Sequence, residues 1–200
     1  MERTVYKPLP MARMNAGAIY QPPLGAHSPH PVREDSPAIE VMTDLRRIDA
    51  ATITADATVR QANQEMITRG VRLLLVMGND DQIDGLITAR DTLGERPIKM
   101  LSENGGRHHE LCVADLMVPR SAIDVFDIAT VRRAEVGHII ATLKEVGRQH
   151  ALVVERDAAS GKEAVIGVFS ATQIGRQLGV PVLTFEIAKT FIQIKAELEK

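Results

Sequence analysis

Two pairs of polar side chains follow apolar runs in this sequence at the same spacing of three residues: Thr88 with Asp91, and Ser170 with Gln173. Their chemistry is that of hydrogen bonding, since a hydroxyl donates and accepts while a carboxylate or amide oxygen accepts. The spacing fits a capping box, in which the third helical residue reaches back to the residue that starts the helix. Each pair could therefore cap the start of a helix or contact a ligand.

Side chains arranged for catalysis or metal binding were sought and not found. The sequence has no Gly-x-Gly-x-x-Gly, Gly-x-x-x-x-Gly-Lys, His-Glu-x-x-His or Gly-x-Ser-x-Gly motif. The pairs His27/His30 and His108/His109 lie in predicted loops without Cys or carboxylates at zinc spacing, so we expect solvated histidines and no metal. We expect no enzymatic activity. A hydrolase that uses Cys112 is a weak alternative, which loss of activity in Cys112→Ala would support.

Charge and composition restrict the partners and the compartment. With 24 basic and 26 acidic residues the net charge is -2, which gives no attraction for nucleic acid. No apolar run reaches the length of a secretory signal or a membrane span, so no membrane is expected. A single Cys cannot form an internal disulfide. The default expectation is a cytoplasmic protein.

The elements that must position these side chains come from an internal repeat. Residues 59–76 align with residues 136–153 at a constant offset of 77, and residues 85–89 align with 167–171 after a hairpin lengthened by five residues. An upstream segment, 41–43, matches 116–119. Most of the chain therefore consists of two copies of one unit.

Each copy reads as β-α-β-β-α. Helical periodicity places two sets of apolar residues on inner faces, Val59, Ala62, Met66 and Ile67 in the first copy and Val136, Ile139, Ile140 and Leu143 in the second. Strands are predicted at 71–77 and 83–87, and again at 151–154 and 164–169. Neither copy has the apolar area to stand alone, so the sequence predicts an α/β fold in which the two sheets pack together.

The predicted organisation has five parts. Seven of the ten prolines lie in residues 1–37, which favours an extended or disordered tail. The first copy spans 38–94 and the second 113–178, joined by a linker at 95–112. Residues 179–200 contain an amphipathic pattern, which predicts a C-terminal helix that covers an apolar surface.

The duplicated unit, opened by a Met-containing segment and closed by Gly-apolar-apolar-Thr-x-x-Asp, resembles the CBS domain pair, also called a Bateman module. The similarity covers roughly residues 40–178, and its most specific part is residues 85–91. The resemblance implies tandem CBS domains packed pseudo-symmetrically, which bind adenosine-containing ligands between the copies, regulate another protein and do no chemistry themselves.

The resemblance also implies a set of ligand-contacting residues. Thr88 and Asp91 match positions that contact phosphate and ribose, and a carboxylate suits both hydroxyls of a ribose. In the second copy Ser170 keeps the hydroxyl, while Gln173 replaces the Asp and brings no charge. We therefore favour ligand contact for the first pair and capping for the second. The remaining matched positions have residues that would contact the edge of the adenine, pack on the base, neutralise a phosphate or assist a second ligand. They are Ile53, Thr54, Val71, Arg72, Leu73, Arg90, Arg148 and His150.

The sequence thus predicts a regulatory module that binds AMP, ADP, ATP or S-adenosylmethionine mainly at the first copy. The resemblance and the apolar face near the C-terminus imply a homodimer, and an unidentified regulated protein is a further expected partner. The alternative is a scaffold without a ligand, in which the proline-rich tail and the C-terminal helix dock on other proteins.

Overall fold

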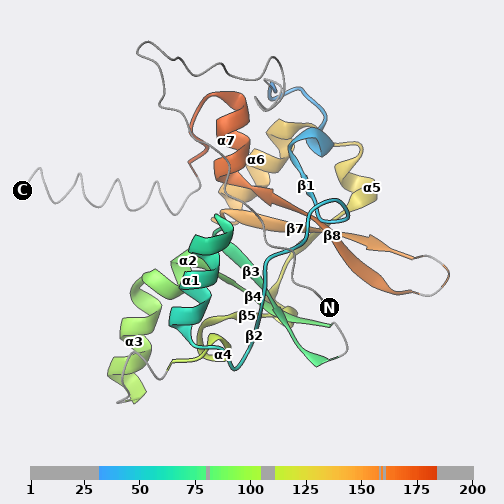
Figure 1. Ribbon diagram of the computed structural model, residues 1–200. Coiled ribbons are helices and arrows are strands. Elements are labelled where there is room, and N and C mark those ends of the chain that lie inside the picture. The colour runs from blue at the N-terminus through green and yellow to red at the C-terminus, as the bar shows by residue number, and fades with distance from the viewer. Residues whose placement is uncertain (1–31, 80–81, 105–110, 158, 160, 184–200) are drawn as a thin grey trace, which may run out of the picture. The chain divides into compact units, whose positions relative to one another are not determined.

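The computed structural model describes residues 32–79, 82–104, 111–157, 159 and 161–183 (Figure 1). The predicted C-terminal helix from residue 184 onward, the first 31 residues of the predicted tail and all four loop histidines of the sequence analysis lie outside these ranges. The described part of the chain contains two four-stranded sheets with helices packed on them.

The first sheet has the order β2-β3-β4-β5 and the second the order β1-β8-β7-β6. Their strands are β2 (Thr52–Thr54), β3 (Leu73–Met77), β4 (Ile83–Thr88), β5 (Val118–Pro119), β1 (Thr43–Asp44), β6 (Val125–Asp127), β7 (His150–Arg156) and β8 (Glu163–Ser170). In each sheet a parallel pair, β2 with β3 or β6 with β7, adjoins an antiparallel hairpin. The hairpins shift register at Val76/Met77 and at Val153/Val154, which are 77 residues apart. The predicted α/β duplication is confirmed.

The two copies exchange their opening strands. Strand β1 comes first in the chain but pairs with β8 of the second copy, with Thr43 opposite Val168. Strand β5 opens the second copy but pairs with β4 of the first, with Val118 opposite Leu86. Because each edge strand belongs to the other sheet, neither copy is complete without its neighbour.

Helices cover one face of each sheet (Figure 1). The first copy has α1 (Val59–Arg69), α2 (Ala89–Leu93), α3 (Glu95–Asn104) and α4 (Val113–Leu116), and the second has α5 (Ile128–Val131), α6 (Val136–Glu145) and α7 (Ala171–Leu178). Short 3₁₀ turns lie at η1 (Ala38–Val41) and η4 (Arg120–Ala122). Helix α1 starts in a capping box made by Thr58 and Gln61 and ends at Gly70, whose φ of 64° is left-handed.

The buried apolar residues of the described chain form three clusters. One lies under α1, one under α6 and α7, and the third joins the sheets through Leu75, Leu86 and Leu152. All four residues predicted for the inner face of α6 are buried. The prediction for α1 is wrong at Ile67, which is 74% exposed, because it lies about 100° around the helix from the buried Met66.

The segments on either side of the first copy also pack on the described cores. Within the predicted tail, Val32 is 7% exposed in the second copy's core and its amide donates to the carbonyl of Gln177. Within the predicted linker, helix α3 packs Met100 on the first core. Residues 179–183 follow α7 without helical structure.

Candidate functional site

Two cavities lie between the copies. The large cavity has a volume of about 270 Å³ and is lined by the start of α7, the entrance of β3 and residues 48–51 before β2. The small cavity has a volume of about 180 Å³ and is lined by the β4–α2 junction, residues 148–150 and Val118 of the exchanged strand β5. The two are related by the repeat, since the large cavity contains the Ser170/Gln173 pair and the small cavity the Thr88/Asp91 pair.

Helix α7 presents a polar face to the large cavity. Thr172, Gln173 and Arg176 line it, and residues three or four apart on a helix lie on one face. Ser170, at the end of β8, lines the same wall and makes no capping bond with its side chain. Among the described residues, therefore, no intrahelical contact occupies the Ser170/Gln173 pair.

Opposite α7, the segment between β1 and β2 forms the second wall of the large cavity. Ile48 lines this wall although it is 59% exposed, and Asp49 lies beside it. Ala50 and Ala51 complete the segment. An exposed apolar side chain next to a carboxylate and small residues suits a flat ring with a polar edge.

Arg72 connects the two copies across the large cavity. Its Nη2 donates a hydrogen bond of 2.6 Å to the hydroxyl oxygen of Thr172, 100 residues away. Arg72 sits at the entrance of β3, so the fold places a cation of the first copy against α7 of the second. A guanidinium in a cleft is suited to bind a phosphate.

The Thr88/Asp91 pair caps α2. Oδ2 of Asp91 accepts from the backbone N of Thr88 at 2.9 Å and from its hydroxyl at 2.6 Å. Oδ1 accepts from Nη1 of Arg96 at 2.7 Å. Asp91 is 8% exposed, and both of its oxygens have protein partners. The first pair thus makes the capping contact that we expected of the second, and the second pair makes no such contact among the described residues.

His150 lies where the two cavities meet and lines both. Burial, and to a smaller degree the positive charge of Arg72, lowers the pKa of His150 from 6.5 to about 4. The imidazole is therefore neutral at neutral pH and can both donate and accept hydrogen bonds.

The structure brings nine of the eleven predicted contact residues to these cavities. Val71 and Ser170 line the large cavity, and Arg72, Leu73 and His150 line both. The small cavity also receives Thr88, Arg90, Asp91 and Arg148. Ile53 and Thr54 are the exceptions, because Ile53 packs on the first core and Thr54 is exposed.

The residues that the sequence analysis missed are Ile48, Asp49, Thr172 and Arg176. Ile48 and Asp49 lie a few residues before β2 (Thr52–Thr54) and line the large cavity, whereas Ile53 and Thr54 line neither cavity. Thr172 and Arg176 could have been found from helical spacing, since both follow Ser170 on the face that contains Gln173.

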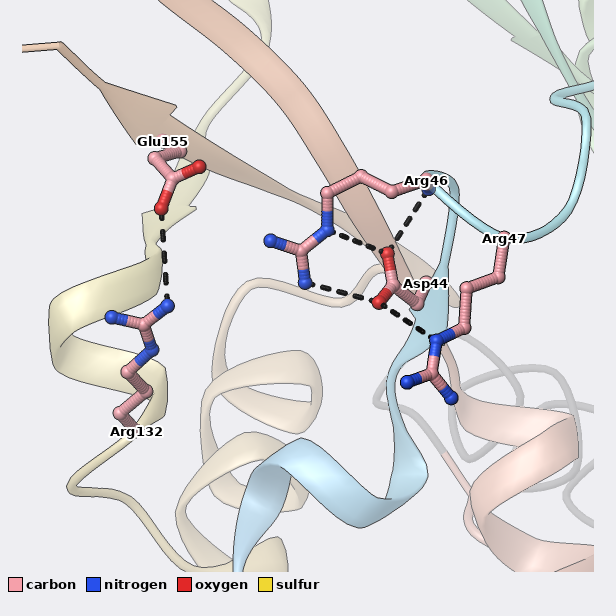
Figure 2. A network of polar contacts seen from close by, with 5 residues as sticks. All are labelled: Asp44, Arg46, Arg47, Arg132 and Glu155. Atoms are coloured by element: carbon pink, nitrogen blue, oxygen red, sulfur yellow. Dashed lines mark hydrogen bonds and ion pairs between the residues drawn. The ribbon is translucent and has the colours of Figure 1, made fainter.

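Another group of charges lies outside both cavities (Figure 2). Asp44 accepts hydrogen bonds from Arg46 at 2.9 and 3.0 Å and forms a longer ion pair with Arg47, while Arg132 pairs with Glu155 at 3.8 Å. The hydrogen bonds from Arg46 lower the pKa of Asp44 to about 2. The Asp44 contacts hold the turn that follows β1, and the Arg132–Glu155 pair joins the end of α5 to β7, so both have a structural role.

Comparison with known protein families identifies a domain in the first copy. The family model for the CBS domain matches residues 38–96. Residues 38–96 are a CBS domain. The family model covers the first copy. The sequence repeat and the matching second sheet extend the CBS architecture to the second copy. No curated protein matches the sequence.

Several solved structures are similar to this chain in fold. An uncharacterized conserved protein from Pyrococcus horikoshii has a TM-score of 0.52 and 18% identity, with 71% of this chain and 91% of that chain covered. CBSX2, a CBS-pair protein from Arabidopsis thaliana, solved in complex with AMP, has a TM-score of 0.48 and 19% identity over 80% and 98% of the chains. A CBS-domain containing protein from Agrobacterium tumefaciens has a TM-score of 0.49 and 16% identity over 66% and 88%.

Two searches of the described residues gave negative results. No group of three or more His, Cys, Asp or Glu side chains there could hold a metal ion. In the same ranges, no helix has the length and apolar character needed to cross a membrane.

Proposed function

We propose that this CBS pair is a regulatory module that binds an adenine nucleotide in the large cavity, against Ser170 and Gln173 of the second copy. The observation that carries the proposal is the difference between the two polar pairs. Asp91 has both oxygens bonded within the protein, whereas Ser170 and Gln173 face a cavity of about 270 Å³ without capping contacts. The proposal thus moves the main site from the first copy to the second.

The walls of the large cavity supply each kind of contact that a nucleotide needs. Ile48, Ala50 and Val71 offer apolar surface for a base, and Asp49 and Gln173 offer oxygens that accept hydrogen bonds from a ribose or an amino group. Arg72 and Arg176 offer guanidinium groups for a phosphate. Pockets for small ligands commonly combine a mostly apolar lining with a few polar groups that fix orientation.

Binding at this position would have a regulatory effect because the cavity lies between the copies. Its walls come from the β3 entrance of the first copy and α7 of the second, and the Arg72–Thr172 bond spans them. A ligand that prefers one arrangement of these walls shifts the protein toward it.

Isothermal titration calorimetry of AMP, ATP and S-adenosylmethionine tests the proposal. We expect saturable binding to the wild-type chain, weakened by about tenfold or more in Arg176→Gln, since a hydrogen bond to a charged group contributes roughly 1.5 to 3 kcal/mol. Arg60→Gln is the matched control, because Arg60 is an exposed arginine on α1 that lines neither cavity. The absence of binding heat for all three ligands would reject the nucleotide function and favour the scaffold.

A further inference from the structure

Exposed apolar side chains gather around the outer part of α7. Thr172 and Arg176 of this helix line the large cavity, and the same two side chains also line a groove with a volume of about 440 Å³. Ile48 borders the large cavity and is 59% exposed, while Val180 borders the groove and is 55% exposed. We call Ile48 and Val180 the apolar rim. Apolar side chains that gather on one surface mark an interaction site, whereas scattered ones need no explanation.

Close backbone packing fixes the direction of the chain after α7. Gly179 has a φ of 71°, which is left-handed, and the next amide, that of Val180, donates to the carbonyl of Gly175 at 3.1 Å. A Cβ at Gly175 would lie 2.8 Å from the carbonyl oxygen of Val180 and 3.0 Å from the backbone N of Val182. Residues 180–182 therefore lie directly against α7. Leu183, the last residue that the structure describes, follows Val182 at the groove and is 46% exposed.

The sequence that follows Leu183 needs an apolar surface. Leu183, Ile187, Phe191 and Ile194 recur at the spacing of one helical face, with Lys and Glu between them. Most of the stability of such a helix comes from packing of its apolar face. Residues 184–200 would form a helix about 25 Å long, about twice the length of the eight-residue α7. The segment is therefore long enough to cross the opening of the large cavity beside α7.

Position along the chain favours the apolar rim over other surfaces. Val180 comes only three residues before Leu183, so docking of the following segment beside Val180 closes a short loop and costs little chain entropy. Ile48 is held in place, because its amide donates to the carbonyl of Asp44 at 3.2 Å in the turn after β1. A second group of exposed apolar side chains, Ile67, Leu93 and Ile98, lies on the helices of the first copy, away from the end of α7 in the chain.

We propose that residues 184–200 dock on the apolar rim of their own chain and cover the opening of the large cavity. Ile187 and Phe191 pack against Ile48 and Val180, and the Lys and Glu side chains of the segment face water. A molecule that enters the large cavity then has to displace the segment, so the C-terminus of the chain acts as a lid. This docking goes beyond the proposed function, because it needs no ligand and holds for any molecule that the cavity binds.

Tryptophan fluorescence of the full-length chain without ligand tests the docking. The sequence contains no Trp, so Phe191→Trp introduces a single reporter. We expect blue-shifted emission relative to the chain in urea and about threefold weaker quenching by acrylamide, because docking removes the indole from water. Ile48→Glu or Val180→Glu, each added to Phe191→Trp, should abolish both effects. Ile67→Glu is the matched control and should change neither, since Ile67 is 74% exposed and lines neither the cavities nor the groove.

Three results would overturn the proposal. Quenching of the reporter in the Phe191→Trp chain that equals quenching in urea would show that the segment does not dock. An effect of Ile67→Glu without an effect of Ile48→Glu would place the segment on the helices of the first copy. A blue shift that is lost on dilution would show that the segment docks on a second copy. A failure of nucleotide binding rejects the proposed function alone, because this measurement contains no ligand.

Discussion

The guanidinium of Arg72 donates a hydrogen bond of 2.6 Å to the hydroxyl of Thr172, and this contact joins the first copy to the helix that forms the polar wall of the large cavity. The guanidinium has further N–H groups, but a ligand phosphate that is to bind Nη2 of Arg72 has to compete with Thr172. In the proposed binding mode the bond therefore opposes ligand binding.

Thr172→Val is predicted to raise nucleotide affinity. The substitution removes the acceptor of Arg72 and leaves the guanidinium charge, so the ligand no longer has to displace a hydrogen bond worth roughly 0.5 to 1.5 kcal/mol. We expect binding about threefold tighter by calorimetry. Arg72→Gln should instead weaken binding about tenfold. Tenfold weaker binding in Thr172→Val would show that the hydroxyl contacts the ligand itself.

Substitution of Asp91 is predicted to change stability, and substitution of Gln173 is predicted to change AMP affinity. Asp91→Asn impairs the α2 cap and removes the ion pair with Arg96, so it should lower the free energy of unfolding by about 1 to 2 kcal/mol in urea denaturation. Its AMP affinity should change less than twofold. Gln173→Ala should weaken AMP binding about fivefold and leave stability within about 0.5 kcal/mol. The opposite pattern would restore the first copy as the main site.

The architecture was readable from the sequence, whereas the choice of site was not. The offset of 77 residues places α1 on α6 and β3 on β7, because hydrophobic periodicity depends on local spacing alone. The Thr88/Asp91 pair is ambiguous for a physical reason: the same two side chains at the same spacing make a capping box or bind a ribose. The position of Arg96, which donates to the second oxygen of Asp91, favours the capping role.

The contribution of residues 48–51 to the large cavity depends on the exchange of edge strands between the copies. No local sequence pattern encodes that exchange. Because β1 pairs with β8, the chain that follows β1 passes the second copy before it enters β2 in the first. That route places Ile48 and Asp49 opposite α7. Sequence matching predicts a contact at Ile53 and Thr54, inside β2, and these two residues line neither cavity.

His150 is predicted to make the fold less stable in mild acid. Its pKa in the folded protein, about 4, lies below the ordinary value of 6.5, so the unfolded chain binds the proton more readily. The stabilising contribution of the neutral imidazole is fully present above pH 6.5 and is lost as the pH falls toward 4. The loss is on the order of 3 kcal/mol at most. Urea denaturation at pH 7 and pH 4.5 should show a smaller acid loss for His150→Gln than for the wild-type chain, and equal losses would contradict the assignment.

The strand exchange is predicted to tolerate an added methyl group much less well in the first sheet than in the second. A Cβ at Gly85 would lie 2.5 Å from the carbonyl oxygen of Val118, which is backbone of the exchanged strand β5 and cannot move without breaking the pairing. A Cβ at Gly167 would also meet an atom at 2.5 Å, but that atom is Sδ of Met42, the end of a flexible side chain.

Gly85→Ala should therefore lower the free energy of unfolding by about 2 to 3 kcal/mol, and Gly167→Ala by about 1 kcal/mol or less. Urea denaturation of the two variants measures the difference. If β5 were displaced from β4 in solution, Gly85→Ala would be as mild as its counterpart, and the exchange of edge strands would not hold the first sheet together.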